Sequence, residues 1–224
     1  PPVLVRLHRC ARTPPRPNGR RSINTKTEED KEQEMTDREQ YTPGPASGAQ
    51  VKKDGEMWTL ILTRELRHKP EKVWRALTDP AHLSEWAPFE ADRNLNTVGA
   101  KVNFRWVGAP ASQVTEIKVT RADAPKVLEY NWGEANTRWE LEPIAGGTRL
   151  TMWHSLDRRF IAMGAAGWHI CFDVLDRLLS GTPIGRMVGS EVMKFDGWQR
   201  LHREYASQFG IEPRKWPTQA GKSS

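Results

Sequence analysis

Residues 57–66, MWTLILTREL, and residues 70–80, PEKVWRALTDP, decide the fold of this chain. In the first stretch large apolar residues alternate, so that Trp58, Leu60 and Leu62 share one face, which is typical of a strand with one buried side. In the second stretch Pro70 stands where a helix can begin, apolar residues follow at helical spacing, and Asp79 with the next proline stops the helix. A second short helix is predicted over 81–86.

The alternation of apolar and polar residues resumes beyond residue 100 and continues through a series of short segments. Val102, Phe104 and Trp106 fall on one face of the first segment, and polar residues fall on the other. Further strands are predicted over 114–121, 126–132, 137–142 and 148–154. Gly146 and Gly147 stand between the last two, where a hairpin turn favours glycine. Consecutive short strands of this kind predict an antiparallel meander.

After the last strand the apolar period changes from two to 3.6 residues. A helix is predicted over 161–179, with Trp168 and Phe172 on its apolar face and His169 and Asp173 on a polar arc that we expect to face water. A second helix is predicted over 190–209, with the apolar stripe Phe195, Trp198, Leu201, Tyr205 and Phe209. This order of elements predicts an α+β fold in which the sheet buries one face against the long helix.

The same stretches resemble a known family. Residues 63–66 (TREL), 70–80 and 83–86 (LSEW) are similar to the START-like, or SRPBCC, superfamily. Within it, the chain most resembles the group named after the activator of the heat-shock-protein-90 ATPase, and the later stretches LEY (128–130), GGTRLT (146–151), GWH (167–169) and LDRL (175–178) are similar to that group too. The resemblance covers residues 57–179 and is specific for fold rather than for activity.

The resemblance implies a helix-grip (START-like) fold, a curved antiparallel sheet wrapped around a long carboxy-terminal helix. It also implies a cavity between sheet and helix, which different family members use for lipids, polyketides, hormones or other apolar ligands. Few members are enzymes. The predicted helix over 190–209 goes beyond the family pattern.

The chain of 224 residues fits one domain. We expect residues 1–56 to form a disordered amino-terminal tail and linker, residues 57–210 the helix-grip domain, and residues 211–224 a flexible tail. The first methionine is Met35, which we interpret as the natural start. An Arg-rich transit peptide is the alternative, and the acidic residues around position 30 weigh against it.

The distribution of charge and the number and spacing of cysteines indicate which partners and which cellular compartment to expect. Residues 1–34 contain 8 Lys+Arg and 5 Asp+Glu, and residues 35–224 contain 26 and 23, so each part contributes +3 to the net charge of +6. The folded part is therefore only modestly basic, and without a recognition motif we expect no nucleic-acid partner. No apolar run is long enough for membrane insertion. Cys10 and Cys171 have no metal-ligand spacing, so we expect a cytoplasmic protein without metal or cofactor.

The inward strand faces and the long helix supply the candidate ligand-binding residues. They are Phe104, Trp106, Tyr130, Trp132, Trp139, Met152, His154, Trp168, Phe172 and His202. An aromatic lining with few polar groups suits an apolar ligand, although such stripes are also the ordinary content of a core. His154 shares the parity of Met152 and could donate a hydrogen bond to a ligand, or be satisfied by a neighbouring group. His202 is the second polar candidate, within the apolar stripe of its helix.

No catalytic constellation is evident in the sequence. Hydrolase, zinc-protease, phosphate-loop and dinucleotide motifs are all missing from it. The carboxylates Glu116, Glu129, Glu140 and Glu142 alternate with the apolar residues and should face solvent. The sequence therefore predicts non-enzymatic binding of a small apolar or amphipathic molecule. Two alternatives stay open, namely a co-chaperone-like interaction module and a cavity enzyme that uses His154 or Tyr130 as acid or base.

Overall fold

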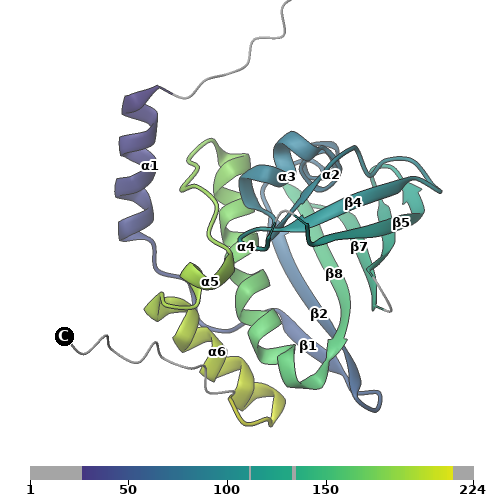
Figure 1. Ribbon diagram of the computed structural model, residues 1–224. Helices are drawn as coiled ribbons and strands as arrows, with labels where there is room; N and C mark the ends of the chain where they lie inside the picture. Colours follow the sequence, from purple (N-terminus) through teal and green to yellow (C-terminus); the bar gives the residue numbers. More distant parts are fainter. Residues whose placement is uncertain (1–26, 111, 133–134, 214–224) are drawn as a thin grey trace, which may run out of the picture.

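The computed structural model describes residues 27–110, 112–132 and 135–213, in which one antiparallel sheet wraps around a long helix (Figure 1). The eight strands of the described residues follow the order β1-β2-β8-β7-β6-β5-β4-β3. They are β1 (Ala49–Lys52), β2 (Met57–Leu66), β3 (Phe89–Ala91), β4 (Lys101–Trp106), β5 (Val114–Asp123), β6 (Val127–Trp132), β7 (Ala135–Ile144) and β8 (Gly147–Asp157). The helices are α1 (Glu28–Gln40), α2 (Pro70–Thr78), α3 (Pro80–Trp86), α4 (Ile161–Ser180), α5 (Gly189–Val192) and α6 (Asp196–Phe209), and the 3-10 turn η1 (Arg158–Phe160) precedes α4. The predicted helix-grip architecture is confirmed.

The strands β2 and β8 are far apart in the sequence but lie side by side in the sheet. β2 pairs with β8 along its whole length, from Met57 opposite Asp157 to Leu66 opposite Thr148. The first residue of β8 is Gly147. A glycine is required there because a Cβ would collide with the Leu66 carbonyl oxygen. Every predicted strand is present, with bounds that differ by a few residues. The strands β1 and β3 are additional, and both were too short for an alternating pattern to reveal them.

The helices α2 and α3 share one boundary residue. Asp79 follows the last turn of α2, and its carboxylate accepts a hydrogen bond from the Ala81 amide at 2.9 Å, which caps the start of α3. Proline occupies the first turn of both helices, where a missing amide hydrogen is not needed. On the buried side Trp86 donates its indole hydrogen to the Ala76 carbonyl oxygen at 3.0 Å. This turn therefore fixes the angle between two short helices at one end of the sheet.

The long helix α4 is covered on two faces, which corrects one prediction. Trp168 and Phe172 face the sheet, as predicted. His169, which we expected to face water, has no exposed surface. The reason is α6, which packs along the other face of α4 and brings Tyr205 against His169 (Figure 1).

The prediction that the residues before Met57 form a disordered tail and linker is wrong for residues 27–56, and residues 1–26 lie outside the described part of the chain. The helix α1 and the strand β1 both precede Met57, and Tyr41 between them is buried with 4% of its surface exposed. A capping box formed by Thr27 and Asp30 starts α1, although none of its residues is buried. We call residues 41–48 the strap, because they run from α1 across α4 and α6 to β1.

The predicted helix over 190–209 is interrupted. The structure has a short α5 and a separate α6, with Phe195 at the start of α6. The ring of Phe195 stacks on Tyr41 of the strap, with ring centroids 6.0 Å apart. The carboxy-terminal helix is therefore joined to the amino-terminal strap. Among the described residues, no helix has the length and apolar character that crossing a membrane requires.

Candidate functional site

The inward aromatic residues form one closely packed cluster. The ring of Trp139 lies 5.5 Å from Trp168 and 5.9 Å from Phe172, measured between centroids. Phe104 meets Tyr130 edge to face at 5.4 Å. These separations are those of aromatic pairs in direct contact, so the middle of the sheet–helix interface is filled by the protein's own side chains. Met152 is fully buried beside them on the inward face of β8.

One of the predicted aromatic residues, Trp106, falls outside this cluster. Trp106 shares the parity of Phe104, but it is the last residue of β4 and is 42% exposed. The prediction that Trp106 lies inside the interface is therefore wrong. Trp132 is the last residue of β6, and its side chain lies outside the described part of the structure.

His154 borders the aromatic cluster, two residues beyond Met152 on β8. Its Nδ1 lies 2.9 Å from the hydroxyl oxygen of Thr137 on β7, and its ring meets Trp168 edge to face at 6.0 Å. Desolvation lowers the pKa of His154 to about 4, so the ring is neutral at pH 7. Even so, His154 keeps part of its surface exposed, whereas Thr137 has none. The imidazole is therefore paired with a neighbour, in a residue that is only partly covered.

The structure places His202 away from this interface. It is on α6, on the outer side of α4, where its ring stacks on Trp198 with centroids 5.1 Å apart. The sequence pattern located His202 correctly within an apolar stripe, but that stripe faces α4 rather than the sheet. His202 therefore cannot share a ligand with His154, and the prediction that places it in the sheet–helix site is wrong.

A buried polar cluster joins the strap, β2, α4 and α6, and the sequence did not reveal it. Tyr41 donates to Asp173 Oδ2 at 2.6 Å, and Arg64 Nη2 lies 3.0 Å from Asp173 Oδ1. His169 Nδ1 lies 2.8 Å from the Tyr205 hydroxyl oxygen, and that hydroxyl donates to the Ser47 carbonyl oxygen at 2.9 Å. The four-residue spacing of His169 and Asp173 was the only signal, and it suggested a solvated pair. The cluster fastens the strap and α6 onto β2 and α4.

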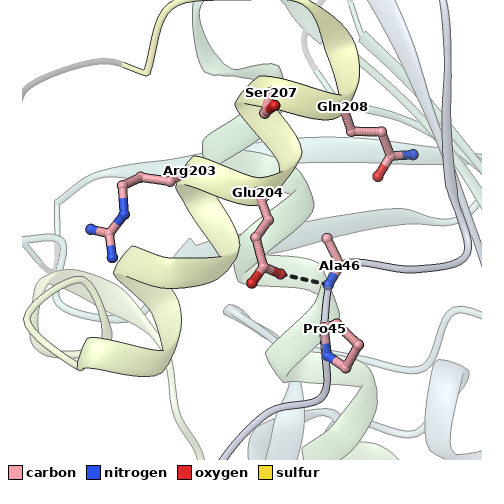
Figure 2. A pocket seen from close by; sticks show the side chains of 6 residues that line it. All are labelled: Pro45, Ala46, Arg203, Glu204, Ser207 and Gln208. Carbon is pink, nitrogen blue, oxygen red and sulfur yellow. Dashed lines mark hydrogen bonds between the residues drawn. The ribbon is translucent and has the colours of Figure 1, made fainter.

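Two depressions stand out on the surface of the described residues, and neither is lined by a predicted site residue. One, of about 590 Å³, is a shallow groove between the strap and α6, lined by Pro45, Ala46, Arg203, Glu204, Ser207 and Gln208 (Figure 2). In Figure 2 the Glu204 carboxylate reaches across to the Ala46 amide, which donates to it at 2.7 Å. The other, of about 330 Å³, lies between α2, α3 and the last turn of α4. The described residues contain no cluster of histidine, cysteine and carboxylate side chains that could hold a metal ion.

The comparisons with solved structures identify the fold. A conserved protein of unknown function from Enterococcus faecalis is 18% identical and superimposes with a TM-score of 0.54, over 71% of this chain and 89% of that one. CalU16 from Micromonospora echinospora is 20% identical, with a TM-score of 0.51 over 75% of this chain and 98% of its own. DynU16, from the dynemicin biosynthetic locus, is 22% identical with a TM-score of 0.51, over 58% of this chain and 51% of its own. At these identities the likeness establishes a shared fold.

The family comparison covers the core of the chain. No curated protein gives a significant match. The profile of the family described as activator of Hsp90 ATPase homolog 1-like protein matches residues 67–180, from the end of β2 to the end of α4. This match spans just over half of the chain and agrees with the helix-grip architecture, so the chain belongs to the activator of Hsp90 ATPase homolog 1-like family within the START-like superfamily.

Proposed function

We propose that this chain binds a small apolar or amphipathic molecule, without converting it, at the end of the sheet–helix interface that carries His154. The environment of His154 is the observation that supports this function. The imidazole packs against Trp168 and is desolvated enough to lower its pKa to about 4, yet the residue as a whole is not fully covered. We take this partly covered position as the mouth of the proposed site, because ligands of this kind are held by burial with one polar anchor.

The proposed roles follow from the contacts at this mouth. Trp168, with 5% of its surface exposed, packs edge to face against His154 and would form the apolar wall beside it. Burial of apolar area would contribute about 25 cal/mol per Å² to the binding free energy. The contact with Thr137 fixes the orientation of the imidazole, so His154 can orient a polar group of the ligand. Because Tyr130, Trp139 and Phe172 fill the space further in, we place the ligand at the mouth rather than at the middle of the interface.

The titratable groups favour binding over catalysis. A general acid or base works best when its pKa lies near the working pH. The pKa of His154 is lowered to about 4, and burial raises the pKa of Tyr130 well above its ordinary value. The Tyr130 hydroxyl also accepts a hydrogen bond from the Trp139 indole at 3.2 Å. Neither group is poised to exchange a proton with a ligand at neutral pH.

Titration of the full chain with the uncharged dye Nile red, followed by dye emission and tryptophan fluorescence, tests this proposal. We expect a saturable signal and about a tenfold loss of affinity in each of His154→Leu and Trp168→Leu, which corresponds to the loss of one good contact. The matched controls His202→Leu and Trp198→Leu change the same residue types on the outer side of α4 and should bind dye as the parent chain does. Far-UV circular dichroism confirms that each variant is folded. A signal that does not saturate, or equal losses in the two pairs, contradicts the proposal.

A further inference from the structure

The depression between α2, α3 and the last turn of α4 has features of a second binding site. Its volume of about 330 Å³ falls at the lower end of the range of small-molecule pockets. It is lined by Glu71, Lys72, Arg75, His82, Leu178 and Leu179. Leu179 lies eleven residues beyond Trp168 on α4, which is about 16 Å along the helix axis at 1.5 Å per residue. This pocket, called here the α2–α4 pocket, is therefore separate from the mouth at His154.

The cationic groups of the α2–α4 pocket differ in how they are engaged. Lys72 donates to the Leu179 carbonyl oxygen at 2.5 Å, so its ammonium group caps the end of α4. Arg75 and His82 form no side-chain ion pair or hydrogen bond with other residues in the described ranges. Glu71 is one helical turn from Arg75, yet the two side chains do not form an ion pair. The guanidinium group of Arg75 thus lines a concave surface, and none of the described residues engages its donors.

The remaining lining is apolar and belongs to α4. Leu179 is buried with 4% of its surface exposed, and Leu178 is half-buried beside it. A ligand that fits the α2–α4 pocket must therefore combine an anionic group for Arg75 with an apolar part for the leucines. A planar guanidinium forms paired hydrogen bonds with a carboxylate. The carboxylate of Glu71 in the same lining disfavours a doubly charged anion, because it repels the second charge.

We infer that the α2–α4 pocket binds a small monocarboxylic acid, with its carboxylate on Arg75 and its short apolar chain against Leu178 and Leu179. His82 lies in the same lining and supplies a second donor to the carboxylate. The inference is independent of the proposed function, because no residue is shared between the α2–α4 pocket and the mouth at His154.

Hexanoate is the probe for this site, and NMR spectra of the full chain report where it binds. We expect saturable shifts of the Leu178 and Leu179 methyl signals and of the Arg75 side-chain NH signal, with hexan-1-ol binding at least about tenfold more weakly. Arg75→Gln should weaken hexanoate binding by about tenfold or more. Glu71→Gln should tighten hexanoate binding, because it removes a repelling carboxylate. A folding defect would weaken binding rather than tighten it. The control Arg203→Gln changes an exposed arginine on α6 and should have no effect.

Four outcomes would overturn the inference. They are equal affinity for hexanoate and hexan-1-ol, unchanged hexanoate affinity in Arg75→Gln, inorganic phosphate competing as well as hexanoate, and hexanoate shifts at Trp168 and His154 without shifts at the two leucines. The last outcome would show that hexanoate binds at His154 rather than in the α2–α4 pocket. Conversely, Nile red can fail to bind while hexanoate still shifts the leucine signals, which would contradict the proposed function alone. The two proposals are therefore tested separately.

Discussion

His169 Nδ1 lies 2.8 Å from the hydroxyl oxygen of Tyr205, and this contact joins the family core to a helix outside it. The hydroxyl hydrogen of Tyr205 points to the Ser47 carbonyl oxygen, so the imidazole donates from Nδ1 and its Nε2 carries no hydrogen. That Nε2 is buried 3.7 Å from Asp173 Oδ2 and has no hydrogen-bond partner among the described residues. A neutral histidine is thus held between α4, α6 and the strap.

The pH dependence of stability should report this histidine. Desolvation lowers the pKa of His169 to about 4, and the unfolded chain keeps the ordinary value of 6.5. Between these values the unfolded chain binds more protons, so the free energy of unfolding falls as the pH drops from 6.5 towards 4. The contribution of His169 is about 3 kcal/mol over the whole window. Urea unfolding between pH 7 and pH 4.5 should show a shallower decline in His169→Asn, and an unchanged slope would contradict the assignment.

The Tyr205 hydroxyl should matter more than the hydroxyl of another buried tyrosine. Tyr205→Phe removes the partner of His169 Nδ1 and of both backbone groups of Ser47. Leaving such groups buried and unpaired costs about 1–3 kcal/mol. Tyr130→Phe is the matched control, because that hydroxyl has one contact, from the Trp139 indole. Chemical denaturation should rank Tyr205→Phe as the more destabilising change, and the reverse order would show that the cluster contributes little.

Two tryptophans of the predicted lining should respond very differently to truncation. Trp139 is 1% exposed and contacts Trp86, Trp168 and Phe172, so Trp139→Ala should cost about 3–5 kcal/mol in the free energy of unfolding. Trp106 is 42% exposed, and Trp106→Ala should cost much less. The midpoints of urea unfolding measure both. Similar losses would mean that Trp106 is covered in solution.

The attachment of the strap to β2 should depend on one glycine. Gly48 has φ +68, and a Cβ there would collide with the Thr63 carbonyl oxygen, which the pairing of β1 with β2 brings close. Gly48→Ala should therefore destabilise the chain by about 1–2 kcal/mol from the backbone conformation alone, with the collision adding to this. Gly44→Ala is the control, because a Cβ at Gly44 meets no atom within 4 Å. Thermal unfolding that is equal in the two variants would contradict the role of Gly48.

The sequence predicted the family core well because each element there has its own pattern. Alternation identified β2 and the meander, and the 3.6-residue period identified α4. Such patterns reveal the buried face of a strand or helix only when the element has a single buried face. They failed for His169, because α4 is buried on two faces, and on the second face His169 pairs with Tyr205 within the contact that α4 makes with the apolar stripe of α6.

The candidate site was less predictable than the fold. Parity placed Phe104, Tyr130 and Trp139 on the inward face, but it could not show that their rings pack against one another. It also placed Trp106 inward, because alternation does not reveal where the covering helices end. The strap was missed because Tyr41 is an isolated apolar anchor in a polar segment, and its partner Asp173 is 132 residues away.

The helix α4 is held between the sheet on one side and the strap with α6 on the other. Under the proposed function, a ligand too bulky for the site at His154 would have to push α4 outward, and that displacement would pull His169 and Asp173 away from Tyr205 and Tyr41. Outward movement of α4 from the sheet and its separation from the strap and α6 would thus occur together. The size limit on a guest is therefore set partly by side chains that never touch it.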